Sequence, residues 1–308
     1  IIYLIVNLAL GYESSFLPVG ICAELLAGYS EEVEEGMSSQ DCAEAKQYGS
    51  HPRFDLACYM KALDGAATLV KLVGDDKADV RVAAIYALGW FPDQAELSAP
   101  ALRAALQGDS SLEVATALIS LGLMAQNSKC IELSEFRAFL HNGAAPLVRF
   151  AAAVALSSEA ISLDVMDLLM QGLANEIEPG SPEQLRINDG NLAGLAGIIL
   201  SQSAPGSRAI ILPALCEALQ DANASTCLDV TSALLQLVMV KDGAILELPV
   251  SARQLSADQH MTLLVIAQHG GWEVDGATFA NFSMLVQSFG LPASRQALLD
   301  YLAGNERN

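Results

Sequence analysis

Residues Asp79–Gly89 read DVRVAAIYALG, and nearly the same word returns twice, as Leu112–Gly122 (LEVATALISLG) and Leu147–Leu156 (LVRFAAAVAL). Aligning the three words places one alanine of each in a common slot, and these slots are 33 and 35 residues apart. A period of this length is typical of stacked helical hairpins. One hairpin cannot bury its own apolar face, so neighbouring hairpins must stack and share a core. The common slot is filled by Ala84, Ala117 and Ala152.

The composition favours an all-α protein. The chain has 308 residues, of which 52% are hydrophobic and only 6% are aromatic. Much of the hydrophobic share is alanine and leucine, which are strong helix formers. Small alanine side chains also let helices approach one another closely. The low aromatic content argues against a β-sandwich or a base-stacking surface.

The chain is strongly acidic, with 16 Lys and Arg residues against 36 Asp and Glu and a formal net charge of −20. Nucleic acids and anionic membranes are bound through Lys and Arg that neutralise phosphate, so we expect neither partner. Two explanations stay open. The charge can serve solubility or adaptation to salt, or it can attract a basic protein partner.

The six cysteines, scattered without a C-x-x-C pair, predict free thiols and a reducing cytoplasm. A disulfide from Cys22 to Cys42 or to Cys58 is the alternative.

The apolar opening Ile1–Leu10 is too short to span a bilayer and has no basic residues of the kind found in signal peptides. We expect it to be a buried first helix, with a trimmed membrane anchor as the alternative.

Hydrophobic periodicity predicts helices through most of the chain and essentially no sheet. We divide the chain into an N-terminal helical cap with an acidic loop (1–63), a repeat region (64–240) and a C-terminal helical cap (241–308), all in one continuous solenoid. Pro100 is expected in the first turn of its helix, where a missing N–H is tolerated. Pro213 falls at the corresponding place within a later first helix, which supports aligning the two helices. The expected helices span 64–73, 78–90, 99–106, 112–126, 133–141, 144–157, 163–174, 191–202, 208–220, 226–240, 254–270, 278–289 and 293–303.

The word Asp-x-x-Val-Arg-x-x-Ala-x-x-Ala-Leu-Gly, preceded by a helix and an Asp turn, resembles the HEAT-repeat family. It is most similar to the short bacterial HEAT-like repeats that also occur in phycobilisome bilin lyases. The resemblance covers about Asp64 to Ser157. The second word departs from it, with Val114 in the arginine slot, and the third has Ser157 in place of the glycine. Tetratricopeptide and ankyrin repeats have similar periods, but their signature words do not occur.

This resemblance implies a right-handed α-solenoid whose second helices line a concave face, and a bacterial scaffold without enzymatic activity. It also implies that Arg81 and Arg149 bond aspartates in the turns along the stack. The structural repeat residues are therefore Asp76, Asp79, Arg81, Asp109 and Arg149, with Asp109 as the N-terminal cap of its helix.

No catalytic, metal or cofactor-binding residues are predicted. The four histidines have no zinc-ligand spacing, and no nucleophile elbow or Walker loop occurs. The glycines of Gly190–Gly197 resemble a phosphate loop, but close helix packing is the simpler explanation. Likewise, His269–Gly271 is interpreted as a helix stop followed by a turn.

Trp90 and Phe91, at the end of a second helix, are two large aromatics that could anchor a partner. The competing interpretation is that they fill the junction between hairpins. With the acidic Glu113 they form the predicted partner-binding set. We therefore predict a cytoplasmic protein-binding scaffold that needs no cofactor, with a basic protein as its candidate partner. The alternatives are a bilin lyase or a chaperone-like maturation factor, and a DNA glycosylase of HEAT-like fold, for which the chain has too few basic residues.

Overall fold

The structure is a computed structural model of the chain, and its helices fall into two compact units whose boundary follows Phe136. The first unit holds the described residues between 65 and 136, and the second holds those between 137 and 304. The predicted N-terminal cap, 1–63, lies outside the described residues. These are 65–125, 128–141, 143–158, 161–174, 176–177, 192–203, 205–223, 226–241, 244–272 and 277–304.

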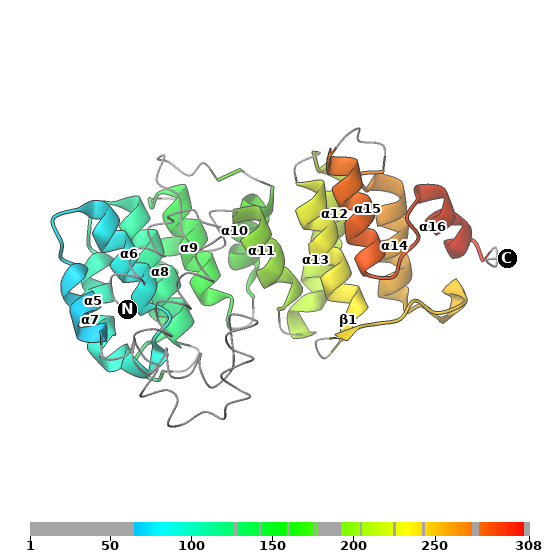
Figure 1. The fold of residues 1–308 in the computed structure, drawn as a ribbon. Helices are drawn as coiled ribbons and strands as arrows, with labels where there is room; N and C mark the ends of the chain where they lie inside the picture. The colour runs from blue at the N-terminus through cyan, green and yellow to red at the C-terminus, as the bar shows by residue number, and fades with distance from the viewer. Residues whose placement is uncertain are drawn as a thin grey trace, which may run out of the picture. The chain divides into compact units, whose positions relative to one another are not determined.

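The first unit consists of two helical hairpins, α5–α6 and α7–α8 (Figure 1). Helix α5 packs on α7, and α6 packs on α8, so equivalent helices of successive hairpins lie side by side. This is the arrangement that the repeated word predicts. The helices are α5 (Ala66–Leu72), α6 (Ala78–Leu88), α7 (Ala95–Ala105) and α8 (Ser111–Ala125), with a short 3₁₀ helix η1 (Pro92–Gln94) before α7.

Small side chains allow α6 and α8 to approach closely. A Cβ added to Gly89 would lie 2.9 Å from the Cα of Ser120, so glycine is required there by the neighbouring backbone. The Ser120 hydroxyl donates a hydrogen bond of 2.9 Å to the carbonyl of Ile85, which satisfies a polar group at the centre of the contact. The slot alanines Ala84 and Ala117 are fully buried. The repeated word is thus the packing face of the hairpin stack.

The second unit continues the same pattern of antiparallel helices. Helix α10 packs on both α9 and α11, while α13 packs on α11, α12 and α14 (Figure 1). The slot residue of the third word, Ala152, is fully buried as well. The helices are α9 (Pro146–Leu156), α10 (Leu163–Leu173), α11 (Leu192–Ser201), α12 (Arg208–Asp221), α13 (Cys227–Met239), α14 (Ala257–His269), α15 (Ala277–Ser288) and α16 (Arg295–Leu302), with 3₁₀ helices η4 (Pro205–Ser207) and η5 (Ala252–Gln254).

The two helix prolines lie at the same depth in their helices, which for Pro100 is deeper than expected. Pro100 is in α7, which begins at Ala95, and Pro213 is in α12, which begins at Arg208, so each is the sixth residue of its helix. The expectation of a first-turn proline was wrong for Pro100, because α7 begins at Ala95 and not at residue 99. A proline at this depth removes one intrahelical hydrogen bond. The identical depth supports equating these two helices as first helices of hairpins.

Two other elements differ from the expected helices. The segment expected as a helix over 133–141 is the 3₁₀ helix η2 (Leu133–Leu140). A short antiparallel hairpin, β1 (Val240–Lys241) with β2 (Ala244–Ile245), follows α13 where no sheet was expected. The fold class, an all-α stack of helical hairpins, is confirmed within each unit. Its right-handed sense, and the division into repeats over 64–240 and a cap over 241–308, stay predictions.

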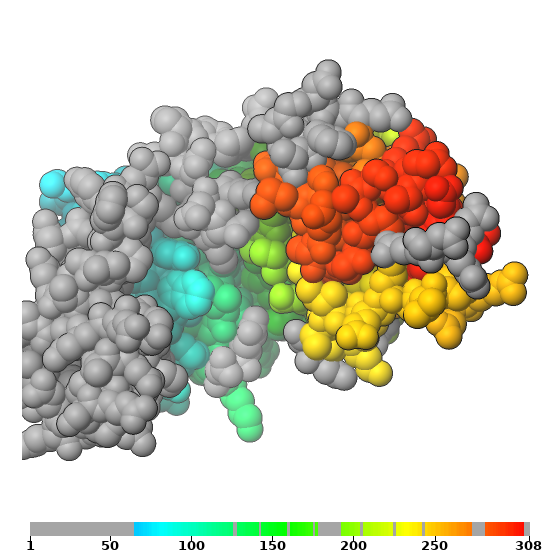
Figure 2. Space-filling model, turned by 45° about the vertical axis from the view of Figure 1, so that its right-hand side comes forward, coloured from blue at the N-terminus to red at the C-terminus, as the bar shows by residue number. Residues whose placement is uncertain are grey.

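The end of the second unit is held together by contacts between distant segments. The extended segment after β2, drawn in yellow in Figure 2, lies against Phe289 and Tyr301. The Tyr301 hydroxyl donates a hydrogen bond of 2.9 Å to the carbonyl of Pro249. Helix α14 begins with a capping box formed by Ser256 and Gln259. Among the described residues, no helix is long and apolar enough to cross a membrane.

Candidate functional site

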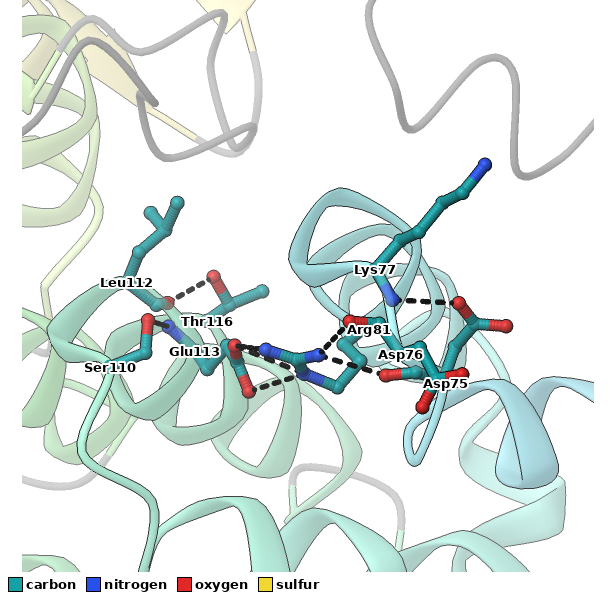
Figure 3. A network of polar contacts seen from close by, with 8 residues as sticks. All are labelled: Asp75, Asp76, Lys77, Arg81, Ser110, Leu112, Glu113 and Thr116. Atoms are coloured by element: carbon teal, nitrogen blue, oxygen red, sulfur yellow. Dashed lines mark hydrogen bonds and ion pairs between the residues drawn. The ribbon is translucent and has the colours of Figure 1, made fainter.

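The most elaborate polar network of the first unit surrounds Arg81 (Figure 3). Its guanidinium donates to both carboxylate oxygens of Glu113, with a shortest distance of 2.7 Å, although the two residues are 32 positions apart. A second edge of the same guanidinium donates to the backbone carbonyls of Asp75 and Asp76, at 2.8 and 3.1 Å. One side chain therefore fastens the turn of its own hairpin to the start of α8 in the next. The hydrogen bond that Arg81 donates to Glu113 raises the pKa of Arg81 above its ordinary value.

Glu113 was predicted to bind a partner, and the structure contradicts this. The residue is only 9% exposed, and Arg81 occupies its carboxylate. Its role is structural, because it joins two hairpins. The prediction treated Glu113 as a free acidic residue, since the repeated word alone does not show that an arginine of the preceding repeat reaches it.

A second rung of the same kind joins the first helices. Arg103, near the end of α7, donates to both carboxylate oxygens of Glu135 at 2.7 and 2.9 Å, and to the carbonyl of Cys130 at 2.9 Å. The separation is again 32 residues. Arg103 holds the pKa of Glu135 below its ordinary value, so acidification weakens this rung. Both rungs thus join an arginine to a glutamate 32 positions later, close to the period of the repeated word.

The remaining repeat residues were only partly placed correctly. Asp76 uses its backbone carbonyl rather than its carboxylate to accept from Arg81. Arg149 likewise reaches a backbone carbonyl, that of Leu140, at 3.3 Å. Arg81 and Arg149 thus donate to backbone carbonyls, where bonds to aspartate side chains were predicted.

The predicted cap of α8 and the repeat residue Asp79 complete the set. Asp109 is exposed, and the hydroxyl that accepts from the Glu113 amide at the start of α8 belongs to Ser110. The cap is thus one residue later than predicted, because α8 begins at Ser111. Asp79 is an exposed residue in the first turn of α6, where its charge complements the helix dipole.

Trp90 and Phe91 point to different environments. Phe91 is 4% exposed, which excludes it as an accessible anchor and matches its interpretation as a junction residue. Trp90 is 54% exposed, and its ring meets Tyr86 edge-on, with ring centroids 6.1 Å apart. Of the predicted partner-binding set, Trp90 alone presents a large side chain at the surface of the described residues.

The second unit contains a groove between α10 and α12 that sequence analysis did not identify. Its cavity volume is about 690 Å³, and it is lined by the C-terminal halves of both helices and by the start of α13. Four exposed carboxylates border it, and no lysine, arginine or histidine is among the lining residues in the part of the chain that the structure describes. The carboxylates belong to Asp167, Glu176, Glu217 and Asp221. Helical spacing places Asp167 near Met170 on α10, and Glu217 near Asp221 on α12. These two local spacings are what the sequence shows of the groove.

The predicted glycine cluster and two of the cysteines occupy packing positions. Gly194 and Gly197 lie inside α11 rather than in a loop, and a Cβ on Gly197 would touch α13 at 3.4 Å, as the close-packing interpretation requires. Burial raises the pKa of the Cys216 and Cys227 thiols, which reduces their reactivity. Burial also raises the pKa of Asp229. No group of three or more His, Cys, Asp or Glu side chains in the described residues could hold a metal ion.

Comparison with known families agrees with the geometry of the first unit. A family model for HEAT repeats matches residues 55–122, which include α5 to α7 and most of α8. Residues 55–122 are thus similar to HEAT repeats. No curated protein matches the chain. HEAT repeats are commonly protein-interaction scaffolds. In the first unit, the arginine–glutamate rungs account for how successive repeats are fastened together.

Proposed function

We propose that this HEAT-repeat chain is a non-enzymatic scaffold that binds a basic protein partner. The observation that carries the proposal is the groove of the second unit, where four carboxylates border a cavity and none of the described lining residues is basic. The chain as a whole is also negative, with a formal net charge of −20. Complementary charge accelerates encounter with a basic partner and disfavours acidic ones such as nucleic acids.

The free cysteines support a cytoplasmic location. Cys130, Cys216 and Cys227 are free thiols, and Cys130 is partly exposed. Free thiols persist in reducing compartments. In the first unit, Trp90 is the residue we propose as an additional contact, because exposed aromatics are favoured at binding hot spots.

Capture on the immobilised full chain tests this function. We expect a basic protein from the native host to be retained at low salt and released at about half-molar salt, where the Debye length falls to a few ångströms. An unrelated acidic protein of similar net charge on the same support is the control. Retention of the same proteins by the control would contradict a specific scaffold. A partner whose affinity is unchanged between low and half-molar salt would contradict its recognition by charge.

A further inference from the structure

The groove between α10 and α12 combines an apolar floor with an acidic border. Met166, Met170 and Leu173 come from α10, and Ala214 and Ala218 come from α12. Methionine side chains are flexible and polarisable, so they adapt to apolar side chains of different shapes. Small alanines on the facing helix leave the space that the cavity occupies. The floor is therefore suited to receiving apolar side chains from a partner.

The apolar strip extends beyond the cavity. Leu163 is 63% exposed and lies seven residues before Met170, on the same face of α10. Ile210 is 36% exposed and lies four residues before Ala214 on α12. Both exposed side chains thus continue the strip toward the helix N-termini. A partner element longer than the cavity could follow it.

The border of the groove selects for positive charge. Asp167 and Glu176 stand on the α10 side, and Glu217 and Asp221 on the α12 side, all exposed. Both helices also end at the groove, at Leu173 and Asp221, so their last carbonyls add partial negative charge. An acidic or nucleic-acid ligand would be repelled from both sides.

We propose that this groove is the docking site for a basic amphipathic helix of the partner protein, an inference that rests on the proposed function. Apolar side chains at helical spacing enter between Met166, Met170 and the alanines of α12. Lysine or arginine side chains on either flank of that stripe pair with the four carboxylates. Other proteins that recognise an amphipathic helix likewise receive its apolar face in a hydrophobic groove.

A synthetic peptide tests the proposal on the full chain. The probe is a fluorescent peptide of about 18 residues, roughly five helical turns, with leucine at every third or fourth position and lysine elsewhere. Its affinity is measured by fluorescence anisotropy. The control peptide keeps the leucines and replaces every lysine with glutamate. We expect the lysine peptide to bind and the glutamate peptide to show no binding. Failure of the lysine peptide to bind, or equal binding of both, would overturn the proposal.

Matched variants locate the binding site. Neutralising the border with Asp167→Asn, Glu217→Gln and Asp221→Asn should weaken binding about tenfold or more, the result of losing three charge contacts of about half a kcal/mol each. The same charge change at exposed acidic positions of the first unit, made with Asp79→Asn, Glu96→Gln and Asp109→Asn, should weaken it less than about threefold. All six positions are exposed, so both variants should fold, as thermal unfolding would verify.

A single change in the floor separates apolar insertion from charge attraction. Met170→Gln should weaken the lysine peptide about threefold or more while leaving the salt dependence of binding as it is in the wild type. Equal weakening by the two charge variants would overturn the groove assignment, yet salt-sensitive capture of a basic protein would still support the scaffold function. Absence of any such capture would instead overturn the function itself.

Discussion

Replacing Phe150 with alanine should lower the free energy of unfolding by about 3–5 kcal/mol, the range for a large aromatic in a closed core. Phe150 is fully buried on α9, and its ring lies against Gly172 of α10. In the repeat alignment its slot holds Val82 and Ala115 in the other two words. The second unit therefore accommodates one large ring by removing the side chain that faces it.

The contact between Phe150 and Gly172 also predicts that Gly172→Ala destabilises the wild type but stabilises the Phe150→Ala variant. In the wild type, Gly172→Ala places a Cβ into the ring of Phe150, including its Cδ2 at 2.8 Å, and should destabilise the chain by about 1–3 kcal/mol. In the Phe150→Ala background the space is open. There, Gly172→Ala should stabilise the chain by up to about 1 kcal/mol, because alanine is the better helix former.

Urea unfolding of the four chains of this double-mutant cycle measures both effects. The matched control is Gly197→Ala, where the added Cβ meets its neighbours only at 3.4 to 3.6 Å. This substitution should change the free energy of unfolding by less than about 1 kcal/mol. If Gly172→Ala had the same effect with and without Phe150, the described packing of α9 on α10 would be wrong.

Replacing Arg81 with methionine should lower the free energy of unfolding by about 2–3 kcal/mol, the cost expected for charged hydrogen bonds. The substitution removes the bonds to the turn carbonyls and leaves the carboxylate of Glu113 at 12% side-chain exposure without its cation. Leaving a poorly hydrated charge unpaired is the larger part of this loss.

Arg103→Met supplies the comparison, because its ion pair with Glu135 is 36% and 37% exposed. This change should cost at most about 1 kcal/mol. Adding Glu113→Gln to Arg81→Met should restore part of the lost stability, since the unpaired charge is then gone. Equal losses for Arg81→Met and Arg103→Met in urea unfolding would mean that the burial of Glu113 has no energetic weight.

The hairpin stack could be predicted because it follows from the local periodicity of hydrophobic residues. The slot residues Ala84, Ala117 and Ala152 are all fully buried, and most helix bounds lie within a few residues of the expected ones. Such positions are fixed by the apolar face of each helix, which a single sequence shows directly.

Contacts between repeats could not be predicted in the same way. The pairing of Arg81 with Glu113 depends on which side chains of adjacent hairpins lie side by side. The repeated sequence word does not show how one hairpin is positioned against the next. The complementarity of Phe150 and Gly172 is a relation between two helices with no common signal. The groove was missed for the same reason: Met170 and Asp221 are ordinary residues of their own helices, and stacking α10 beside α12 brings them to one cavity.

The account depends on neighbouring hairpins sharing one core, and hydrogen exchange in a Leu118→Ala variant tests this most directly. Leu118 is fully buried on α8, which packs on α6. Its truncation should cost about 2–5 kcal/mol. If the core is shared, amides of α6 should lose protection together with those of α8. Loss of protection confined to α8, with wild-type exchange in α6, would contradict the shared core.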